Sequence, residues 1–282
     1  MYAQSPVIFT IAEMDSSTQQ RKGGGDGRTE SAFFQNVVVM RHGDRLDNFE
    51  PMWVKTADKP WDPPLTDDGV VRAFTTGCKF RDLAYPIHRV FVSPFLRCVQ
   101  TASQVVSALC AVGETPTADS ISAAAIDPSR VKVSIEYGLC EMLNSVAIRK
   151  GYAPDDGIFA FKLSELEKQF PVGTVDDSVE RIYEGMPRWG ESTDDARRRY
   201  QRTIRALADR YPCENILFVT HGEAVGVSVR QFLEEFDVME VEYCAYVELG
   251  RHVFRQENQV SIENFQVATH PIKTGIQLIK LN

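Results

Sequence analysis

Two short apolar runs, far apart in this chain, each end in a histidine that is followed by a glycine. Residues 37–40 (Val-Val-Val-Met) precede Arg-His-Gly at 41–43, and residues 216–219 (Ile-Leu-Phe-Val) precede Thr-His-Gly at 220–222. A short apolar run of this kind is typical of a buried strand. Open α/β sheets bind ligands outside the carboxyl ends of their strands. Both histidines are therefore expected to face one ligand site.

Strand-like and helix-like segments alternate from residue 36 onward. The predicted strands cover about 36–40, 88–92, 131–135 and 215–219. The predicted helices cover about 66–83, 94–110, 192–210 and 223–235. A late hairpin is predicted around Gly250, from 241–249 and 252–257. This alternation predicts the α/β class, with a mostly parallel central sheet and helices on both faces.

Capping residues define where two of these helices begin. Thr66 is the predicted N-cap of the first helix, with Asp67 and Asp68 in the first turn, where carboxylates suit the helix dipole. Pro94 suits the first turn of the second helix, and this places Ser93 as its cap.

The chain is expected to form one domain with an extension. Residues 1–34 are polar and Gly-rich in part and predict a flexible N-terminal extension. Residues 35–282 form the predicted domain. Within it, residues 144–190 predict an insertion over one face of the sheet, with a short helix near 161–169.

The composition narrows the class of protein. A formal net charge of −8 argues against general binding of nucleic acid, because contact with the phosphate backbone needs a basic surface. No stretch reaches the roughly 18 apolar residues of a membrane span, and the N-terminus lacks the pattern of a secretory signal. Six cysteines without paired spacing favour reduced and mostly buried thiols. We expect a cytoplasmic protein that binds neither nucleic acid nor a membrane.

Several charged residues are expected to join the two histidines. The cation of Arg41 beside His42 favours neutral imidazole, the nucleophilic form. Arg97 lies in the first turn of a predicted helix, and Glu141 lies just beyond a predicted strand. The predicted cluster consists of Arg41, His42, Arg45, Arg97, Glu141 and His221.

Six ordered segments resemble the histidine phosphatase superfamily, the phosphoglycerate-mutase-like proteins. They span roughly residues 36–235. The matching residues are Arg41-His42-Gly43 with Arg45 and Asn48; Pro64-Leu65-Thr66 with Gly69 and Ala73; the run from Ser93 to Ala102; Gly138-Leu139 with Glu141; Gly190-Glu191-Ser192; and Thr220-His221-Gly222. One Arg-His-Gly triplet would be weak evidence, but six segments in the family's order are strong.

Within the superfamily, the chain is most similar to the phosphatase domain of the suppressor-of-T-cell-signalling proteins and the ecdysteroid-phosphate phosphatases. Arg45, the Asp-Pro-Pro-Leu-Thr run at 62–66 and the Ser-Pro-x-Leu-Arg-Cys-Val-Gln-Thr-Ala run at 93–102 carry this likeness. Dimers are common in that branch, so a homodimer is one expected assembly.

The resemblance implies a phosphomonoester phosphatase that acts through a phosphohistidine. His42 is the implied nucleophile, His221 the donor to the phosphoryl oxygens, and Glu141 the acid and then the base. The implied phosphate ligands are Arg41, Arg45, Asn48, Arg97 and Gly222. The acid role requires a protonated Glu141, and hence a raised pKa, which we attribute to burial and the nearby phosphate. Arginines would supply the charge of a metal ion, so no metal and no cofactor are expected.

Two other functions remain open at this stage. A phosphoglycerate mutase would use the same groups, but the chain lacks the mutase-like Phe-Thr-Gly-Trp stretch after Gly43. A non-catalytic scaffold would keep the fold, although such proteins usually lose a member of the catalytic set. The substrate, a small molecule or a protein, is not identified; residues 46–62 and 144–190 are expected to select it. The aromatic candidates for a pocket wall are Trp53, Trp61 and Tyr137.

Some charged residues are expected to lie outside the site. The run Arg197 to Arg199, with Arg202 and Arg205, predicts a solvated helix face. Glu223 follows the second His-Gly pair and is a competing carboxylate, as are Asp44 and Asp47. Cys98 and Cys140 adjoin predicted site residues, where oxidation of a thiol would matter.

Overall fold

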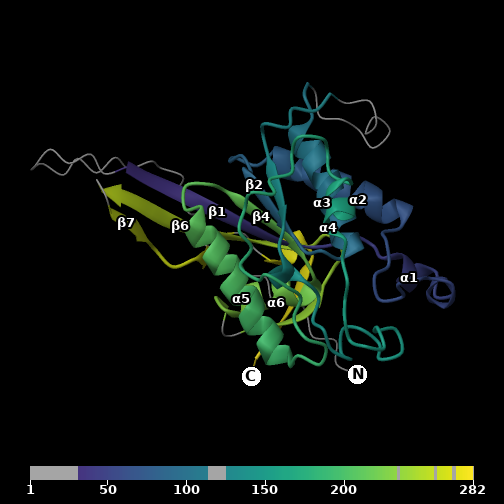
Figure 1. Cartoon of the computed structure of the whole chain (residues 1–282). Coiled ribbons are helices and arrows are strands. Elements are labelled where there is room, and N and C mark those ends of the chain that lie inside the picture. The colour runs from purple at the N-terminus through teal and green to yellow at the C-terminus, as the bar shows by residue number, and fades with distance from the viewer. Residues whose placement is uncertain (1–30, 114–124, 234–235, 257–258, 269–270, 282) are drawn as a thin grey trace, which may run out of the picture.

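The structure is a computed structural model and describes residues 31–113, 125–233, 236–256, 259–268 and 271–281 (Figure 1). Most of the predicted N-terminal extension, residues 1–30, lies outside the described residues. Strand β1 begins at Ser31, so residues 31–34 belong to the central sheet. In the described ranges, no helix is long and apolar enough to cross a membrane.

One sheet of the described residues holds seven strands around a parallel centre. The order is β3-β2-β4-β1-β6-β7, and β8 also pairs with β6. The parallel strands are β1 (Ser31–Arg41), β2 (Arg89–Val92), β3 (Lys132–Ile135) and β4 (Ile216–Thr220). The antiparallel strands are β6 (Tyr246–Gln256), β7 (Gln259–Ile262) and β8 (Gln266–Val267). A separate two-stranded sheet joins β5 (Phe236–Val241) to β9 (Ile276–Lys280).

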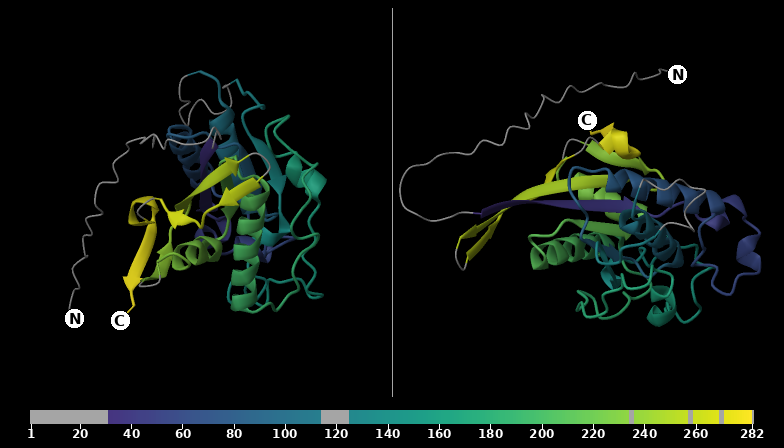
Figure 2. Two further views of the ribbon diagram at one scale, coloured as in Figure 1. Left: turned by 90° about the vertical axis from the view of Figure 1, so that its left-hand side faces the viewer. Right: turned by 90° about the horizontal axis from the view of Figure 1, so that it is seen from above.

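Helices cover both faces of the central sheet, as Figures 1 and 2 show. Helices α2 (Asp67–Arg81) and α3 (Leu96–Cys110) lie on one face, and α5 (Thr193–Arg210) and α6 (Gly222–Arg230) on the other. Each face of the sheet has its own hydrophobic core, which we call the α2/α3 core and the α5/α6 core after the helices that cover it. Along β1, Val38 and Met40 lie in the α2/α3 core, while Val37 and Val39 lie in the α5/α6 core. This alternation is the period of two of an extended strand. The predicted α/β class and layering are confirmed.

Of the two predicted caps, Thr66 is confirmed and Ser93 is wrong. Thr66 Oγ1 accepts a hydrogen bond from the Gly69 N–H at 2.9 Å, and Ser192 Oγ accepts one from the Asp195 N–H at 3.0 Å. Helix α3 begins at Leu96, two residues later than predicted, so Ser93 is not its N-cap. The Leu96 N–H instead donates to Oδ1 of Asp62, at 2.7 Å, so a carboxylate from a distant segment occupies that position.

The predicted late hairpin around Gly250 is wrong. Residues 246–256 form one continuous strand, β6, which pairs antiparallel with β1. Gly250 lies opposite Asn36, and a Cβ atom there would lie 2.4 Å from the ring of Phe34. The glycine therefore provides room for a ring that lies across the strand, and it does not make a turn.

Shorter elements complete the described chain. Helix α6 ends at Arg230, five residues before its predicted end. The short helices are α1 (Leu46–Phe49), α4 (Leu163–Glu167), η1 (Trp53–Lys55), η3 (Tyr137–Leu139) and η4 (Pro271–Thr274). In the predicted insertion, Phe159 and Phe170 are buried in the α2/α3 core, and Val175 forms a bridge with Val133 of β3.

Candidate active site

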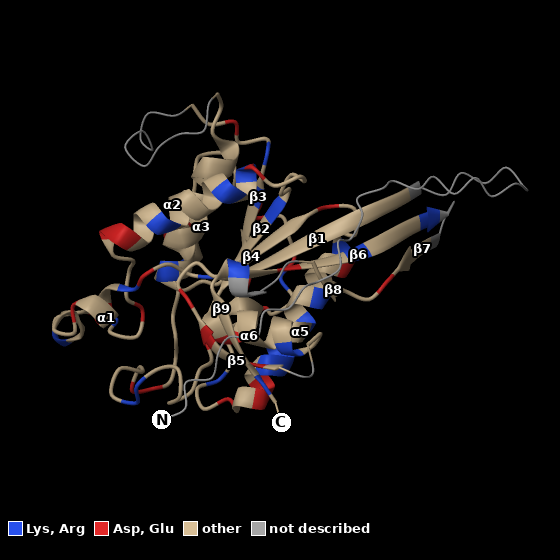
Figure 3. Ribbon diagram, turned by 180° about the vertical axis from the view of Figure 1, so that it is seen from behind, with Lys and Arg blue, Asp and Glu red and all other residues tan. Residues whose placement is uncertain are grey.

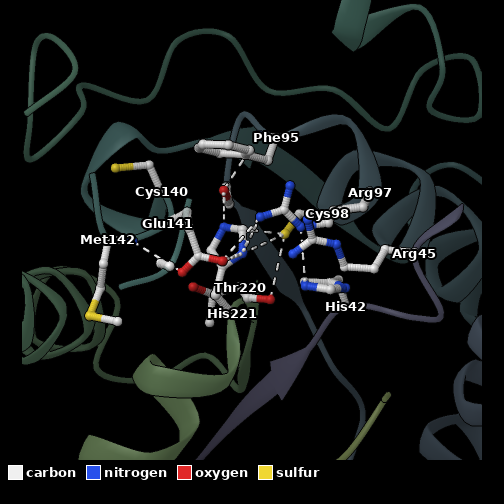
Figure 4. A network of polar contacts seen from close by, with 12 residues as sticks. His42, Arg45, Phe95, Arg97, Cys98, Cys140, Glu141, Met142, Thr220 and His221 are labelled. Carbon is white, nitrogen blue, oxygen red and sulfur yellow. Dashed lines mark hydrogen bonds and ion pairs between the residues drawn. The ribbon is translucent and has the colours of Figure 1, made fainter. Parts of the chain in front are cut away.

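The register of two neighbouring strands brings the histidines together. Strands β1 and β4 are parallel, with Arg41 opposite Thr220, so the residues that follow them, His42 and His221, lie at the same level. The His42 N–H donates to the Thr220 carbonyl at 3.0 Å. The ring centroids of the two histidines are 5.5 Å apart, and both side chains are buried (Figure 4).

Arg97 links both histidines to Glu141. It lies in the first turn of α3, as predicted, and only 1% of its surface is exposed. Its Nε donates to His42 Nε2 at 3.1 Å, and its Nη2 donates to Glu141 Oε2 at 3.0 Å (Figure 4). Nη1 is buried and has no hydrogen-bond partner among the described residues. A buried guanidinium with an unpaired N–H group is suited to bind an anion.

The hydrogen bonds of His42 define where its proton lies. Nδ1 is 2.8 Å from the Gly43 carbonyl, which can only accept, so Nδ1 carries the proton. Nε2 then has a lone pair, which faces Arg97. Burial, followed by the charges of Arg97, His221 and Arg41, holds the pKa of His42 well below its usual value. His42 is therefore neutral, the state that a nucleophilic imidazole requires.

His221 presents a proton to the same site. Its Nδ1 lies 3.1 Å from Glu141 Oε2, which only accepts, and 3.2 Å from Nη2 of Arg97, which only donates. We assign the proton to Nδ1, because Nη2 of Arg97 already donates to Glu141 and the carboxylate is the nearer group. Nε2 of His221 lies 2.9 Å from Ser93 Oγ and accepts from that hydroxyl group. Burial lowers the pKa of His221 to about 4, although Glu141 acts in the opposite direction. The neutral ring therefore has an N–H group that can donate to a bound oxygen.

Glu141 lies in the cluster, and in the free site its pKa is low. Burial alone raises the pKa of Glu141, yet His221, Arg97 and Arg45 together outweigh burial and hold it well below its usual range. In the free site, burial alone therefore does not give the raised pKa that the acid role requires. Glu141 is a carboxylate there, because cations face it from several elements.

A buried arginine holds the segment that carries Glu141. Nη1 of Arg199 donates to the carbonyls of Gly138 and Cys140, at 2.8 and 2.9 Å. Nη2 donates to the Glu141 carbonyl at 3.3 Å and to Glu191 at 2.5 Å. Only 3% of the surface of Arg199 is exposed, so its prediction as part of a solvated face is wrong. The other arginines of α5 are more exposed and follow acidic residues in its first turn (Figure 3).

Arg45 and Arg41 approach the cluster differently. Arg45 donates from Nε and Nη2 to the two oxygens of Asp47, each at 2.7 Å. Its positive charge also lowers the pKa of Glu141. The guanidinium of Arg41 lies 4.3 Å from the ring centre of Tyr243 and donates to the Val241 carbonyl. Within the described residues Arg41 makes no hydrogen bond to the cluster, so it influences His42 through its charge.

Asn48 and Gly222 lie at the edge of the site. Nδ2 of Asn48 donates to the Tyr243 hydroxyl oxygen at 2.5 Å. Asn48, Tyr243 and Arg41 line a hollow of about 390 Å³ with Arg72. Gly222 is the first residue of α6 and lies next to the Arg41 side chain. A Cβ atom built on Gly222 would lie 3.6 Å from Cδ of Arg41. Within the described residues, neither Asn48 nor Gly222 makes a hydrogen bond to His42 or Arg97.

Three supporting residues were not predicted as site residues. Thr101 Oγ1 accepts from the Gly43 N–H at 2.9 Å; it lies four residues after Arg97, so helical spacing could have indicated it. Ser93 orients His221, and its place in the matching segment was the available signal. The ring of Tyr243 lies 5.9 Å from that of His42, and no local pattern marks it.

The competing carboxylates are paired elsewhere. Glu223 binds Arg197 and Arg230, and Asp44 binds Arg72. Asp47 is held by Arg45. These pairs leave Glu141 as the carboxylate that contacts both Arg97 and His221.

The cysteines and the aromatic candidates are also placed. All six cysteines are in described residues, none forms a disulfide, and Cys98, Cys110, Cys140 and Cys244 are buried. Burial raises the pKa of Cys140 to about 12 and raises that of Cys98 as well, so neither has the low pKa of a reactive thiol. Of the aromatic candidates, Trp61 lines a hollow beside Arg97, but Trp53 and Tyr137 do not.

Comparison with known proteins defines the family. Residues 37–117 and 161–260 match the sequence model of the histidine phosphatase superfamily (branch 1). The chain belongs to this superfamily. Glu141 lies between the two matched segments, so its position in the site rests on the geometry described above.

Similar proteins agree with the predicted branch. The ecdysteroid-phosphate phosphatase of Drosophila melanogaster is 25% identical over 223 residues, which cover 70% of this chain and 27% of that protein. The ubiquitin-associated and SH3 domain-containing protein A of Mus musculus is 30% identical over 102 residues, or 27% of this chain and 16% of that protein. This chain therefore matches about a quarter or less of the length of these relatives.

A solved structure has the same fold. It is the ecdysone phosphate phosphatase, EPPase, from Bombix mori in complex with tungstate. Its TM-score is 0.57 at 22% identity, and the match covers 84% of this chain and 93% of the other.

Proposed function

We propose that this protein is a phosphomonoester phosphatase that acts through a phosphohistidine on His42. The proposal rests on two neighbouring groups: an imidazole lone pair on His42, and the guanidinium of Arg97, which has an N–H group without a partner. Nε2 of His42 lies 3.1 Å from Nε of Arg97, whose buried Nη1 has no partner in the described residues. A phosphoryl group placed there would meet both a nucleophile and a cationic clamp.

In the first step, Nε2 of the neutral His42 attacks phosphorus in line with the leaving oxygen. The N–P bond forms as the P–O bond breaks, and its electron pair stays on the leaving oxygen. Arg97 and the Nδ1–H of His221 stabilise the charge on the phosphoryl oxygens. The Nδ1–H of His42 stays bound to the Gly43 carbonyl, which keeps the ring oriented.

Glu141 would supply the proton that the leaving oxygen needs. Because Glu141 is ionised in the free site, the proton must arrive with the substrate. A phosphomonoester below its second pKa of about 6 carries one proton. Its transfer to Glu141 gives a dianion for the clamp and an acid for the leaving group. In the second step water attacks phosphorus, Glu141 accepts its proton and the N–P electron pair returns to His42. The phosphate then leaves with that proton.

This route suits an acid-type phosphatase. His42, with its lowered pKa, stays neutral at acidic pH, where the substrate still carries a proton. We also propose a cytoplasmic location, supported by the burial of four cysteines as small apolar side chains. The clamp supplies positive charge, so the proposed route uses no metal or cofactor.

The decisive experiment measures turnover and the covalent intermediate together. The purified chain should hydrolyse p-nitrophenyl phosphate between pH 4 and 8 and incorporate acid-labile phosphate on His42. His42→Ala should lose at least about a thousandfold in kcat, because the other imidazole of the described site, His221, has its Nε2 on the Ser93 hydroxyl group and its Nδ1 beside Glu141. His252→Ala is the matched control, since His252 is exposed on β6. Folded protein without turnover would refute the proposal.

A phosphoglycerate mutase is the second candidate in this family. A coupled assay with 3-phosphoglycerate and a bisphosphoglycerate primer distinguishes it from a phosphatase. Isomerisation faster than phosphate release would assign the mutase activity. A folded chain that does neither reaction would instead be a scaffold.

A further inference from the structure

A hollow beside the phosphate clamp has the features of a leaving-group pocket. Its volume is about 200 Å³. It shares Arg45 and Arg97 with the catalytic cluster, so a molecule with its phosphoryl group on Arg97 can extend into it. The lining residues are Arg45, Asp47, Asn48, Pro60, Trp61, Arg97, Val146, Ala147, Ile148, Arg149 and Tyr152.

One side of the hollow is apolar. Trp61 is 7% exposed, and the rings of Phe95, Phe159 and Phe161 pack edge-on against it, at centroid distances of 4.9–5.8 Å. Ile148 is also buried, whereas Val146 is exposed at the rim. Trp61 and Ile148 therefore give an apolar side to a hollow whose other lining residues are mostly polar or charged, and one apolar face of a leaving group can lie against them.

The charge at the rim is positive and is not neutralised within the described residues. Arg149 is exposed and contacts Tyr152, from its Nη1 to the hydroxyl oxygen at 3.4 Å; no ion pair of Arg149 is found in those residues. The acidic lining residue, Asp47, has both oxygens on Arg45. An anion at the rim would therefore meet Arg149 without competition from Asp47.

We propose that Arg149 determines specificity by binding a second acidic group on the substrate. This inference rests on the proposed phosphatase function. The substrate class is a phosphomonoester whose leaving group has one apolar face and carries a carboxylate or similar anion. Arginine suits such a group because its planar fork makes paired hydrogen bonds with carboxylate oxygens.

The test compares two substrates that differ in one charge. They are 4-(carboxymethyl)phenyl phosphate and its amide, 4-(carbamoylmethyl)phenyl phosphate, in which the methylene group insulates the leaving oxygen from the change. The native chain should prefer the carboxylate by about tenfold in kcat/KM, as expected for one hydrogen bond to a charged group. Added salt should reduce this preference, because Arg149 is exposed.

Variants assign the preference to Arg149. In Arg149→Gln the ratio should fall toward one, mainly through a higher KM for the carboxylate, and Arg149→Lys should retain part of it. Arg198→Gln is the control, because Arg198 is an exposed arginine of α5 that pairs with Asp195. It should leave the ratio unchanged.

Each result decides one of the two proposals. Turnover of both substrates at equal kcat/KM, or an unchanged preference in Arg149→Gln, would overturn the role of Arg149 and leave the phosphatase standing. If the native chain hydrolysed p-nitrophenyl phosphate but neither of the two substrates, only the role of Arg149 would be overturned. If it hydrolysed none of the three compounds, both proposals would be overturned.

Discussion

The two buried imidazoles carry their protons on the same atom but present different groups to the site. His42 binds the Gly43 carbonyl through Nδ1–H and turns the lone pair of Nε2 toward Arg97. His221 receives the Ser93 hydroxyl at Nε2 and turns Nδ1–H toward Glu141. One ring can therefore attack phosphorus while the other donates to its oxygens. Neighbouring hydrogen bonds, and not residue type, assign these roles.

Glu141→Gln should separate the two steps of the reaction. With an alkyl phosphate such as β-glycerophosphate, the first step should slow by about a hundredfold or more, because the leaving oxygen loses its acid. With p-nitrophenyl phosphate, whose leaving anion is stable, the phosphohistidine should still form but hydrolyse slowly. Rapid-quench measurements should therefore show a burst with the second substrate alone. Equal slowing of the first step for both substrates would contradict the acid role.

At the scale of an element, the start of helix α3 is hydrogen-bonded to a side chain from another segment of the chain. Its first N–H groups have no local cap, and the carboxylate of Asp62 accepts from the Leu96 N–H one residue before Arg97. Burial raises the pKa of Asp62 to about 6, although Arg97 acts in the opposite direction. The helix that carries the phosphate clamp is therefore joined to a carboxyl group that titrates near neutral pH.

Asp62→Asn should change how stability depends on pH. The pKa of Asp62 is higher in the folded protein than its ordinary value of 3.8, so the folded state binds more protons between about pH 4 and 6. Its contribution to stability is complete below pH 4 and is lost as the pH rises through 6. The free energy of unfolding of the native chain, relative to Asp62→Asn, should fall by roughly 2–3 kcal/mol from pH 4 to 7.

Urea denaturation at several pH values measures this difference. The amide side chain of the Asp62→Asn variant would keep an oxygen that accepts from the Leu96 N–H, so the helix should still start there. The exposed carboxyl of Asp155 provides the control, as Asp155→Asn. A difference between the native chain and Asp62→Asn that does not vary with pH would show that Asp62 is ionised throughout this range.

At the scale of the whole molecule, residues from both halves of the chain together set the protonation states of the site. The cluster combines His42 from the end of β1, Arg97 from α3, Glu141 from the segment after β3 and His221 from the end of β4. Burial and the cations lower the pKa of both histidines, while the cations and His221 lower that of Glu141. The free site therefore holds neutral bases and an ionised acid at neutral pH.

These protonation states predict the pH dependence of the reaction. For an alkyl phosphate, kcat/KM should be highest below about pH 6 and fall up to about tenfold per unit above it, because the substrate loses the proton that Glu141 needs. His42, with its lowered pKa, should not limit activity between pH 5 and 6. Initial rates at constant ionic strength, with folding checked by circular dichroism, test this. A maximum at pH 8 would contradict the proposed proton source.

The sequence by itself determined the elements and the residues that end them. The apolar runs before His42 and His221 predict parallel strands, and Thr66 caps a helix, because strand period and capping depend on neighbours a few residues apart. The six matching segments placed His42, Arg97 and His221 in one site. These features could be found without coordinates.

Only the tertiary structure decided how distant residues act on each other. It buried Arg199 under the Glu141 segment, brought Asp62 to the start of α3, and placed the Phe34 ring over Gly250. It also made Glu141 an ionised carboxylate. Burial and charge are sums over elements that lie far apart in the chain, and no local pattern contains those sums.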